Sequence, residues 1–120
     1  EPSQAMLAGA RQLHTNERIR WLSDRLPGLE KTMRLGLQFD LIWLSAVWMH
    51  IPPADRSRAF RKLSALLKPA GWIMLSLRHG DFNDGRKAYP VSTYELDKLA
   101  QQHGLIVRRV CGSEDRFKRE

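Results

Sequence analysis

The sequence predicts an α/β fold in which a mostly parallel sheet is flanked by helices. Two stretches, residues 39–47 and 72–77, are apolar almost without interruption, which is typical of strands buried on both faces of a parallel sheet. Between and around them, apolar residues recur at helical spacing. Strands that alternate with such helices form βαβ units with right-handed crossovers, so we expect a single domain over residues 1–120.

The N-terminal third predicts a helix, a short strand and a turn. Ser3 suits the N-cap of the helix, and four apolar residues follow at helical spacing: Met6, Leu7, Ala10 and Leu13. The polar run 14–17 ends this helix. Residues 19–22 are expected to form a strand, which the turn at Pro27-Gly28 closes.

The central third predicts a long strand and a helix with two different faces. Pro52-Pro53 ends the strand at 39–47 and starts the helix, because proline suits the first helical turn. The inward face carries Ala59, Phe60, Leu63, Leu66 and Leu67, and the outward face carries Arg56, Arg58, Arg61, Lys62 and Lys68. Segment 68–71 ends the helix, and we expect Ala70 to resist a left-handed backbone that Gly71 accepts easily.

The C-terminal third predicts a strand, a polar loop, a helix and a last strand. The strand at 72–77 leads into the loop 78–89. Ser92 and Glu95 have the spacing of a capping box, and Val91 and Leu96 that of a hydrophobic staple. Gly104 suits the end of this helix, and residues 105–110 are expected to form the last strand.

Composition restricts the class of protein. The chain has 20 lysines and arginines against 13 aspartates and glutamates, a net charge of +7, so a basic nucleic-acid-binding module is one alternative. The single cysteine excludes an internal disulfide and fits the cytoplasm. The four histidines lack metal-binding spacing, and no apolar run has the length of a membrane span. We therefore expect a cytoplasmic protein with neither a metal site nor a membrane anchor.

Several motifs resemble those of class I S-adenosylmethionine-dependent methyltransferases. They run in family order and at compatible spacing, and they read Glu-Pro-Ser at 1–3 with Met6-Leu7, Phe-Asp-Leu-Ile at 39–42, Ser-Ala-Val-Trp-Met-His-Ile-Pro at 45–52, Leu-Leu-Lys-Pro-Ala-Gly-Trp at 66–72, and Tyr-Pro-Val-Ser at 89–92 with Glu95-Leu96 and Gly104-Leu105. The similarity spans nearly the whole chain. It implies a Rossmann-like sheet of strand order 3-2-1-4-5-7-6 that binds S-adenosylmethionine at the carboxyl ends of its strands.

The resemblance also implies the residues that bind the cofactor. Glu1, with Ser3 beside it, takes the place of the acidic residue that accepts hydrogen bonds from the ribose hydroxyls. Asp24, Arg25 and Leu26 take the place of the adenine-binding segment. Ser45, Ala46 and Val47 lie where the chain passes the methionine part, and small residues there let the backbone approach the ligand.

The catalytic candidates are His50, His79 and Tyr89, which we expect near the mouth of the cleft with Arg78. A histidine could act as a general base, but methyl transfer mainly requires that donor and acceptor are aligned. The methyl acceptor is expected to be a small molecule. Trp48 is expected in the core, with stacking on a ligand as the alternative.

The resemblance also shows what the chain lacks. The sequence has no GxG, so the Gly-rich cofactor loop is absent, and we expect the first and last strands of the family to be missing. The chain alone is therefore expected to be inactive and to bind S-adenosylmethionine weakly or not at all. Open sheet edges would favour a homodimer. A non-catalytic assembly remnant of the fold is a third alternative.

Overall fold

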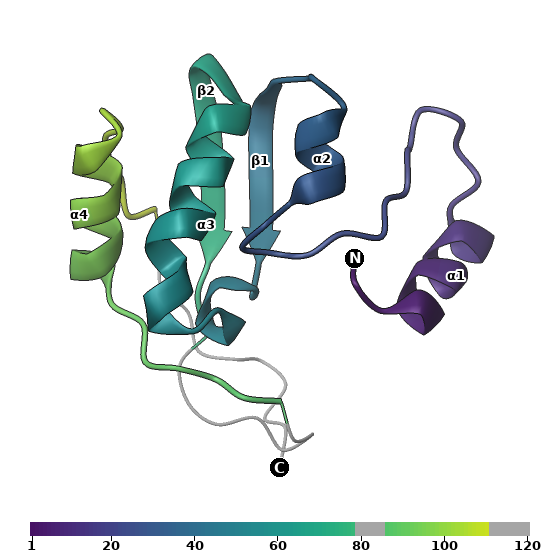
Figure 1. Cartoon of the computed structure of the whole chain (residues 1–120), viewed down its shortest axis with the longest axis horizontal. Helices are drawn as coiled ribbons and strands as arrows, with labels where there is room; N and C mark the ends of the chain where they lie inside the picture. Colours follow the sequence, from purple (N-terminus) through teal and green to yellow (C-terminus); the bar gives the residue numbers. More distant parts are fainter. Residues whose placement is uncertain (79–85, 111–120) are drawn as a thin grey trace.

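A computed structural model describes residues 1–78 and 86–110 (Figure 1). The elements in chain order are α1 (Gln4–Leu13), α2 (Glu30–Arg34), β1 (Phe39–Ser45), a 3-10 turn η1 (Trp48–His50), α3 (Pro53–Leu66), β2 (Leu67–Ser76) and α4 (Thr93–Gln102). Among the described residues the sheet has two strands, β1 and β2, which pair in parallel. The prediction of a partial α/β fold with a parallel sheet is confirmed.

The register of the sheet is regular over most of its length and irregular at one end. Leu41 pairs with Trp72, and the register then runs on to Ser45 opposite Ser76. Phe39 pairs with Leu67, so residues 68–71 of β2 are additional to the ladder. Helix α3 stops at Leu66 and β2 begins at Leu67, so residues 68–71 form a loop within the first part of the strand.

This loop corrects the expectation for Ala70. Ala70 itself has the left-handed backbone, with φ +63. Gly71 is needed for space instead, because a Cβ there would lie 2.8 Å from the Lys68 carbonyl oxygen and 3.0 Å from that of Asp40. The backbone is so closely packed at Gly71 that only glycine fits there, and the left-handed turn is made by Ala70.

One face of the sheet packs on the core and the other is exposed. Ile42, Leu44, Ile73 and Leu75 pack against a buried cluster formed by Trp48, Ile51, Ala59, Phe60, Leu63, Leu96, Leu99 and Ala100. These cluster residues come from η1, α3, α4 and the turn between η1 and α3. In Figure 1, α3 lies in front of the strands, with α4 and α2 on either side and α1 beyond α2. The outward positions of both strands remain exposed.

Two predicted strands do not form. Residues 19–22 and 105–110 have no regular secondary structure. A strand needs a partner for its backbone groups, and within the described residues neither segment has one. Their apolar side chains are exposed accordingly: Ile19 by 42%, Ile106 by 87% and Val110 by 89%.

The helix ends follow the sequence closely, with one helix missed. The Ser3 hydroxyl accepts from the Met6 amide, as expected of the N-cap of α1. Gly104 follows α4 with φ +70, the left-handed conformation expected there. Helix α2 was not predicted, because its five residues are too few to show a periodic pattern.

Candidate functional site at the carboxyl ends of the strands

The parallel pairing brings the last residues of β1 and β2 to the same edge. Ser45 and Ser76 are register partners, and Ala46 follows with φ +50. The Ala46 amide donates to the Ser76 carbonyl oxygen at 3.2 Å and to its hydroxyl oxygen at 2.9 Å. A left-handed backbone costs a non-glycine residue about 1–2 kcal/mol. Ser76 thus holds a strained turn at the edge where α/β folds bind their ligands.

The turn leads directly into η1 and the segment that covers it. The Val47 carbonyl accepts from the His50 amide, which closes η1. The Tyr89 amide donates to the Met49 carbonyl at 2.8 Å, and His50 Nδ1 lies 2.8 Å from the Lys87 carbonyl oxygen. Because a carbonyl can only accept, Nδ1 carries a proton, and Nε2 is the basic nitrogen of the neutral ring. The structure therefore brings the segments of His50 and Tyr89 together, whereas His79 lies outside the described residues.

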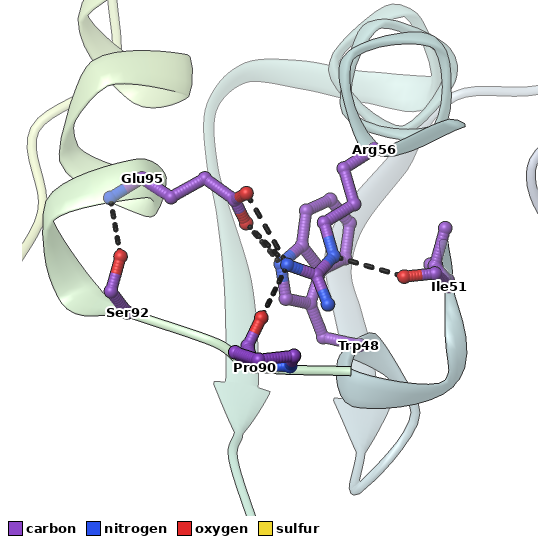
Figure 2. Close-up of polar contacts among 6 residues, drawn as sticks. All are labelled: Trp48, Ile51, Arg56, Pro90, Ser92 and Glu95. Atoms are coloured by element: carbon purple, nitrogen blue, oxygen red, sulfur yellow. Dashed lines mark hydrogen bonds and ion pairs between the residues drawn. The ribbon is translucent and has the colours of Figure 1, made fainter. Parts of the chain in front are cut away.

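Arg56 anchors this region from inside the core (Figure 2), which corrects its placement on the basic outer face of α3. Its side chain is 2% exposed. The guanidinium donates to the carbonyls of Ile51 and Pro90 at 3.0 and 2.8 Å, and to the Glu95 carboxylate at 3.2 Å. A charge this deep in the fold is stable only when paired in this way. Arg56 thus ties together η1, the segment before α4, and α4 itself.

Glu95 has a different role from the one its spacing predicted. The Ser92 hydroxyl accepts from the Glu95 amide at 3.1 Å, which confirms the Ser92 half of the capping box. The Glu95 carboxylate, however, accepts from Arg56 and from Trp48 Nε1 at 3.3 Å (Figure 2). A buried cation and a buried indole need this acceptor more than a helix end does. Trp48 is fully buried in the core, as expected, and packs edge-on against Phe60.

The expected ribose-binding residues lie at the start of α1. Glu1 Oε1 accepts from the Ser3 amide at 2.9 Å, and the Glu1 nitrogen donates to the Leu22 carbonyl at 3.1 Å. Gln4 Nε2 donates to the Ser23 hydroxyl at 3.2 Å. These contacts fix the start of α1 beside residues 22–23, directly before Asp24. The residues predicted to bind ribose, Glu1 and Ser3, thus lie near Asp24, which was predicted to bind adenine.

Asp24 organises the turn that leads into α2. One carboxylate oxygen accepts from the Arg25 amide at 3.0 Å. The other accepts from the Thr32 amide at 2.8 Å and the Thr32 hydroxyl at 2.6 Å. Partial burial opposes ionisation, but these hydrogen bonds outweigh it and lower the pKa of Asp24 below its ordinary value. Asp24 therefore has a structural role, and its role in binding adenine stays a prediction.

Replacing Thr32 by valine is expected to destabilise the fold by about 1 kcal/mol at pH 7, since it removes one hydrogen bond to an ionised group. The lowered pKa means that the Asp24 contribution is present above about pH 4 and lost as the pH falls through the folded-state pKa. Urea unfolding at pH 7 and pH 2.5 should therefore show the effect shrinking in acid. Exposed Thr15→Val is the control, and an equal Thr32→Val effect at both pH values would contradict the assignment.

An apolar groove of about 240 Å³ runs beside β1. Leu26, Leu29 and Thr32 form one wall, and β1 with α3 forms the other. Leu26 thus faces apolar neighbours, which suits the flat side of a base as well as it suits the core. The Thr32 hydroxyl donates to Asp24, so the groove would hold a ligand by its shape and by apolar contacts more than by hydrogen bonds.

Within the described residues, the structure forms two separate clusters from the predicted site. Glu1, Ser3 and Asp24 belong to one, and Ala46 and His50 to the other. Sequence reasoning missed Ser76, although both apolar runs reach a serine, Ser45 and Ser76. It also missed the ion pair of Arg56 with Glu95, which joins residues 39 positions apart.

Comparison with known proteins identifies the family. A model of a methyltransferase domain matches residues 1–75, which is more than half of the chain. The chain belongs to this methyltransferase family. The matched part of the methyltransferase domain includes the Glu1–Asp24 cluster and the Ala46 turn, and it ends one residue before Ser76. No curated protein and no solved structure matches the chain.

In residues 1–78 and 86–110 of the methyltransferase domain, no group of three or more His, Cys, Asp or Glu could hold a metal ion. Over the same ranges, no helix has both the length and the apolarity to cross a membrane.

Proposed function

We propose that this methyltransferase domain uses S-adenosylmethionine and transfers its methyl group to a small-molecule acceptor. The observation that carries the proposal is the strained Ala46 turn, which Ser76 holds at the carboxyl ends of two parallel strands. Strain of this kind is retained where the surrounding structure fixes it, commonly at binding sites.

The residues present fit part of the cofactor. Glu1 is exposed and uses one carboxylate oxygen on Ser3, so further lone pairs can accept from two ribose hydroxyls. Ser45 and Ala46 are small enough for a ligand to approach the backbone. The chain contains no Gly-rich loop, so we propose that its affinity for the cofactor is weak, with a dissociation constant of about 1 mM.

Bound S-adenosylmethionine supplies an electrophilic methyl group on a sulfonium. The protein then has to align that methyl with the acceptor and exclude water, which can account for most of the rate. His50 is the candidate base that the resemblance supplies; its Nδ1 donates to the Lys87 carbonyl and its Nε2 is buried, so an acceptor would reach Nε2 only if the covering segment moved. The Tyr89 backbone amide holds its segment on η1 and thereby limits the space beside the strand ends.

Ligand-observed NMR with S-adenosylmethionine tests the proposal. We expect saturable binding in the millimolar range, which Ser76→Ala weakens about fivefold because the Ala46 amide loses one of its two acceptors. Ser57→Ala, on the exposed side of α3, is the matched control. ATP serves as a charge control, since a +7 chain attracts this anion more than it attracts a sulfonium cation.

Three results would count against the proposal. ATP binding as tight as that of S-adenosylmethionine would show that the chain does not select the sulfonium nucleotide, and equal effects of Ser76→Ala and Ser57→Ala would remove the turn from the site. A micromolar dissociation constant would contradict the expected weak binding.

The basic nucleic-acid-binding alternative draws less support. Arg56, one of the five cations assigned to the outer face of α3, is buried and paired with Glu95. Lys68, another of them, lies 3.6 Å from the Asp40 carboxylate.

A further inference from the structure

The outward face of the β1–β2 sheet is an apolar surface that no helix covers among the described residues. Four side chains form it, and we call them the sheet-face patch: Leu41, Trp43, Trp72 and Met74, exposed by 50%, 66%, 59% and 46%. They are adjacent in two register pairs, Leu41 with Trp72 and Trp43 with Met74. The opposite face of the same strands packs on the core. The patch is therefore contiguous, and Leu41 at its edge also lines the groove beside β1.

The size of the patch exceeds what isolated exposed residues explain. A whole tryptophan has about 250 Å² of surface, so the two tryptophans alone expose roughly 300 Å². With Leu41 and Met74 the patch reaches about 450 Å², within the roughly 300–600 Å² of the largest apolar patch on a typical monomer, which is often functional. Two such patches packed together would bury about 900 Å², close to the roughly 1,000 Å² that a specific interface needs.

The charges favour a second copy over a charged partner. The chain carries +7 overall, yet none of the four patch residues is charged. At the amino end of the strands, Lys68 and Asp40 form an ion pair, so this rim is balanced. Ser45 and Ser76 lie at the other end. Two copies would meet here through uncharged side chains, whereas the four patch residues offer an acidic protein or a nucleic acid no cation.

We propose that the chain forms a symmetric homodimer in which the sheet-face patches of two copies pack against each other. This places the interface on the face of the sheet, whereas the sequence predicted pairing of its edges. A face-to-face contact is isologous, so it closes at two copies. Given its modest area, we expect a dissociation constant of about 1–100 µM. The proposal is independent of cofactor binding.

Sedimentation velocity of the chain between 1 and 200 µM tests the dimer. The expected result is a monomer–dimer equilibrium, which the double substitution Trp43→Thr/Trp72→Thr weakens at least tenfold. Threonine suits an exposed strand position. Ile106→Thr, at a still more exposed apolar residue outside the sheet, is the control and should leave the equilibrium unchanged. A monomer throughout, open-ended oligomers, or a dimer that survives the double substitution would each overturn the proposal.

A second measurement needs no variant. Acrylamide quenching of tryptophan fluorescence reports the access of solvent to Trp43 and Trp72 above a background from buried Trp48 and from partly exposed Trp21, which lies outside the patch. We expect the quenching constant to fall about twofold as the wild-type chain passes from monomer to dimer. Unchanged quenching across a dimerisation seen by sedimentation would show that another surface forms the contact.

Discussion

Replacing Arg56 by alanine is expected to lower the free energy of unfolding by about 3 kcal/mol. Removing one partner of a buried ion pair costs this much because the other groups remain in place without it. Here the Ile51 and Pro90 carbonyls lose their donor as well as the Glu95 carboxylate. Glu95 is 31% exposed and can recover some hydration, which places the effect at the lower end of the usual range.

Urea unfolding monitored by tryptophan fluorescence and circular dichroism measures this effect. Arg61→Ala is the matched control, since Arg61 lies on the same helix but is exposed, and it should change stability by less than about 0.5 kcal/mol. The double substitution Arg56→Met/Glu95→Leu should cost less than the sum of Arg56→Met and Glu95→Leu measured alone, because it leaves neither charge unpaired. Equal effects of Arg56→Ala and Arg61→Ala would contradict the network in Figure 2.

Replacing Gly71 by alanine is expected to destabilise the fold by about 3 kcal/mol. The added Cβ would lie 2.7 Å from a Leu67 methyl, 2.8 Å from the Lys68 carbonyl oxygen and 3.0 Å from the Asp40 carbonyl oxygen. Two of these three atoms are backbone and cannot rotate away, so β1 and β2 must separate locally. Overpacking of this kind costs about 1–3 kcal/mol, and the loss of strand contacts places Gly71 at the upper end.

The neighbouring substitution Ala70→Gly should have the opposite sign. It relieves a left-handed alanine with φ +63, and the gain exceeds the entropy cost of glycine by up to about 1 kcal/mol. The same unfolding measurements compare the two variants. If both substitutions destabilise equally, the division of roles between Ala70 and Gly71 is wrong.

The sequence was sufficient for those parts of the fold that depend on local chemistry. The continuous apolarity of residues 39–47 and 72–77 predicted two parallel strands buried on both faces; they pair in parallel as expected, but only one face of each is covered. Ser3 and Ser92 predicted helix starts, because their hydroxyls act within one turn. The prediction of strands at residues 19–22 and 105–110 was wrong, because a strand depends on a neighbouring strand that its own sequence does not specify.

The site was predictable in outline but not in its supporting contacts. The resemblance pointed to Ala46, and its turn lies at the carboxyl ends of the parallel strands. Its support by Ser76 depends on the register of two strands 30 residues apart. The burial of Arg56 likewise depends on where α4 packs, whereas helical spacing alone placed Arg56 among solvent-facing cations.

Two-dimensional ¹H–¹⁵N NMR of the chain titrated with S-adenosylmethionine tests whether the cofactor binds at the carboxyl ends of the strands, because it locates binding residue by residue. Binding at the carboxyl ends of β1 and β2 predicts that the largest shifts fall on the amides of Ser45, Ala46 and Ser76. Largest shifts on the exposed basic residues Arg58 and Arg61 of α3, or no saturable shifts up to about 10 mM, would contradict it.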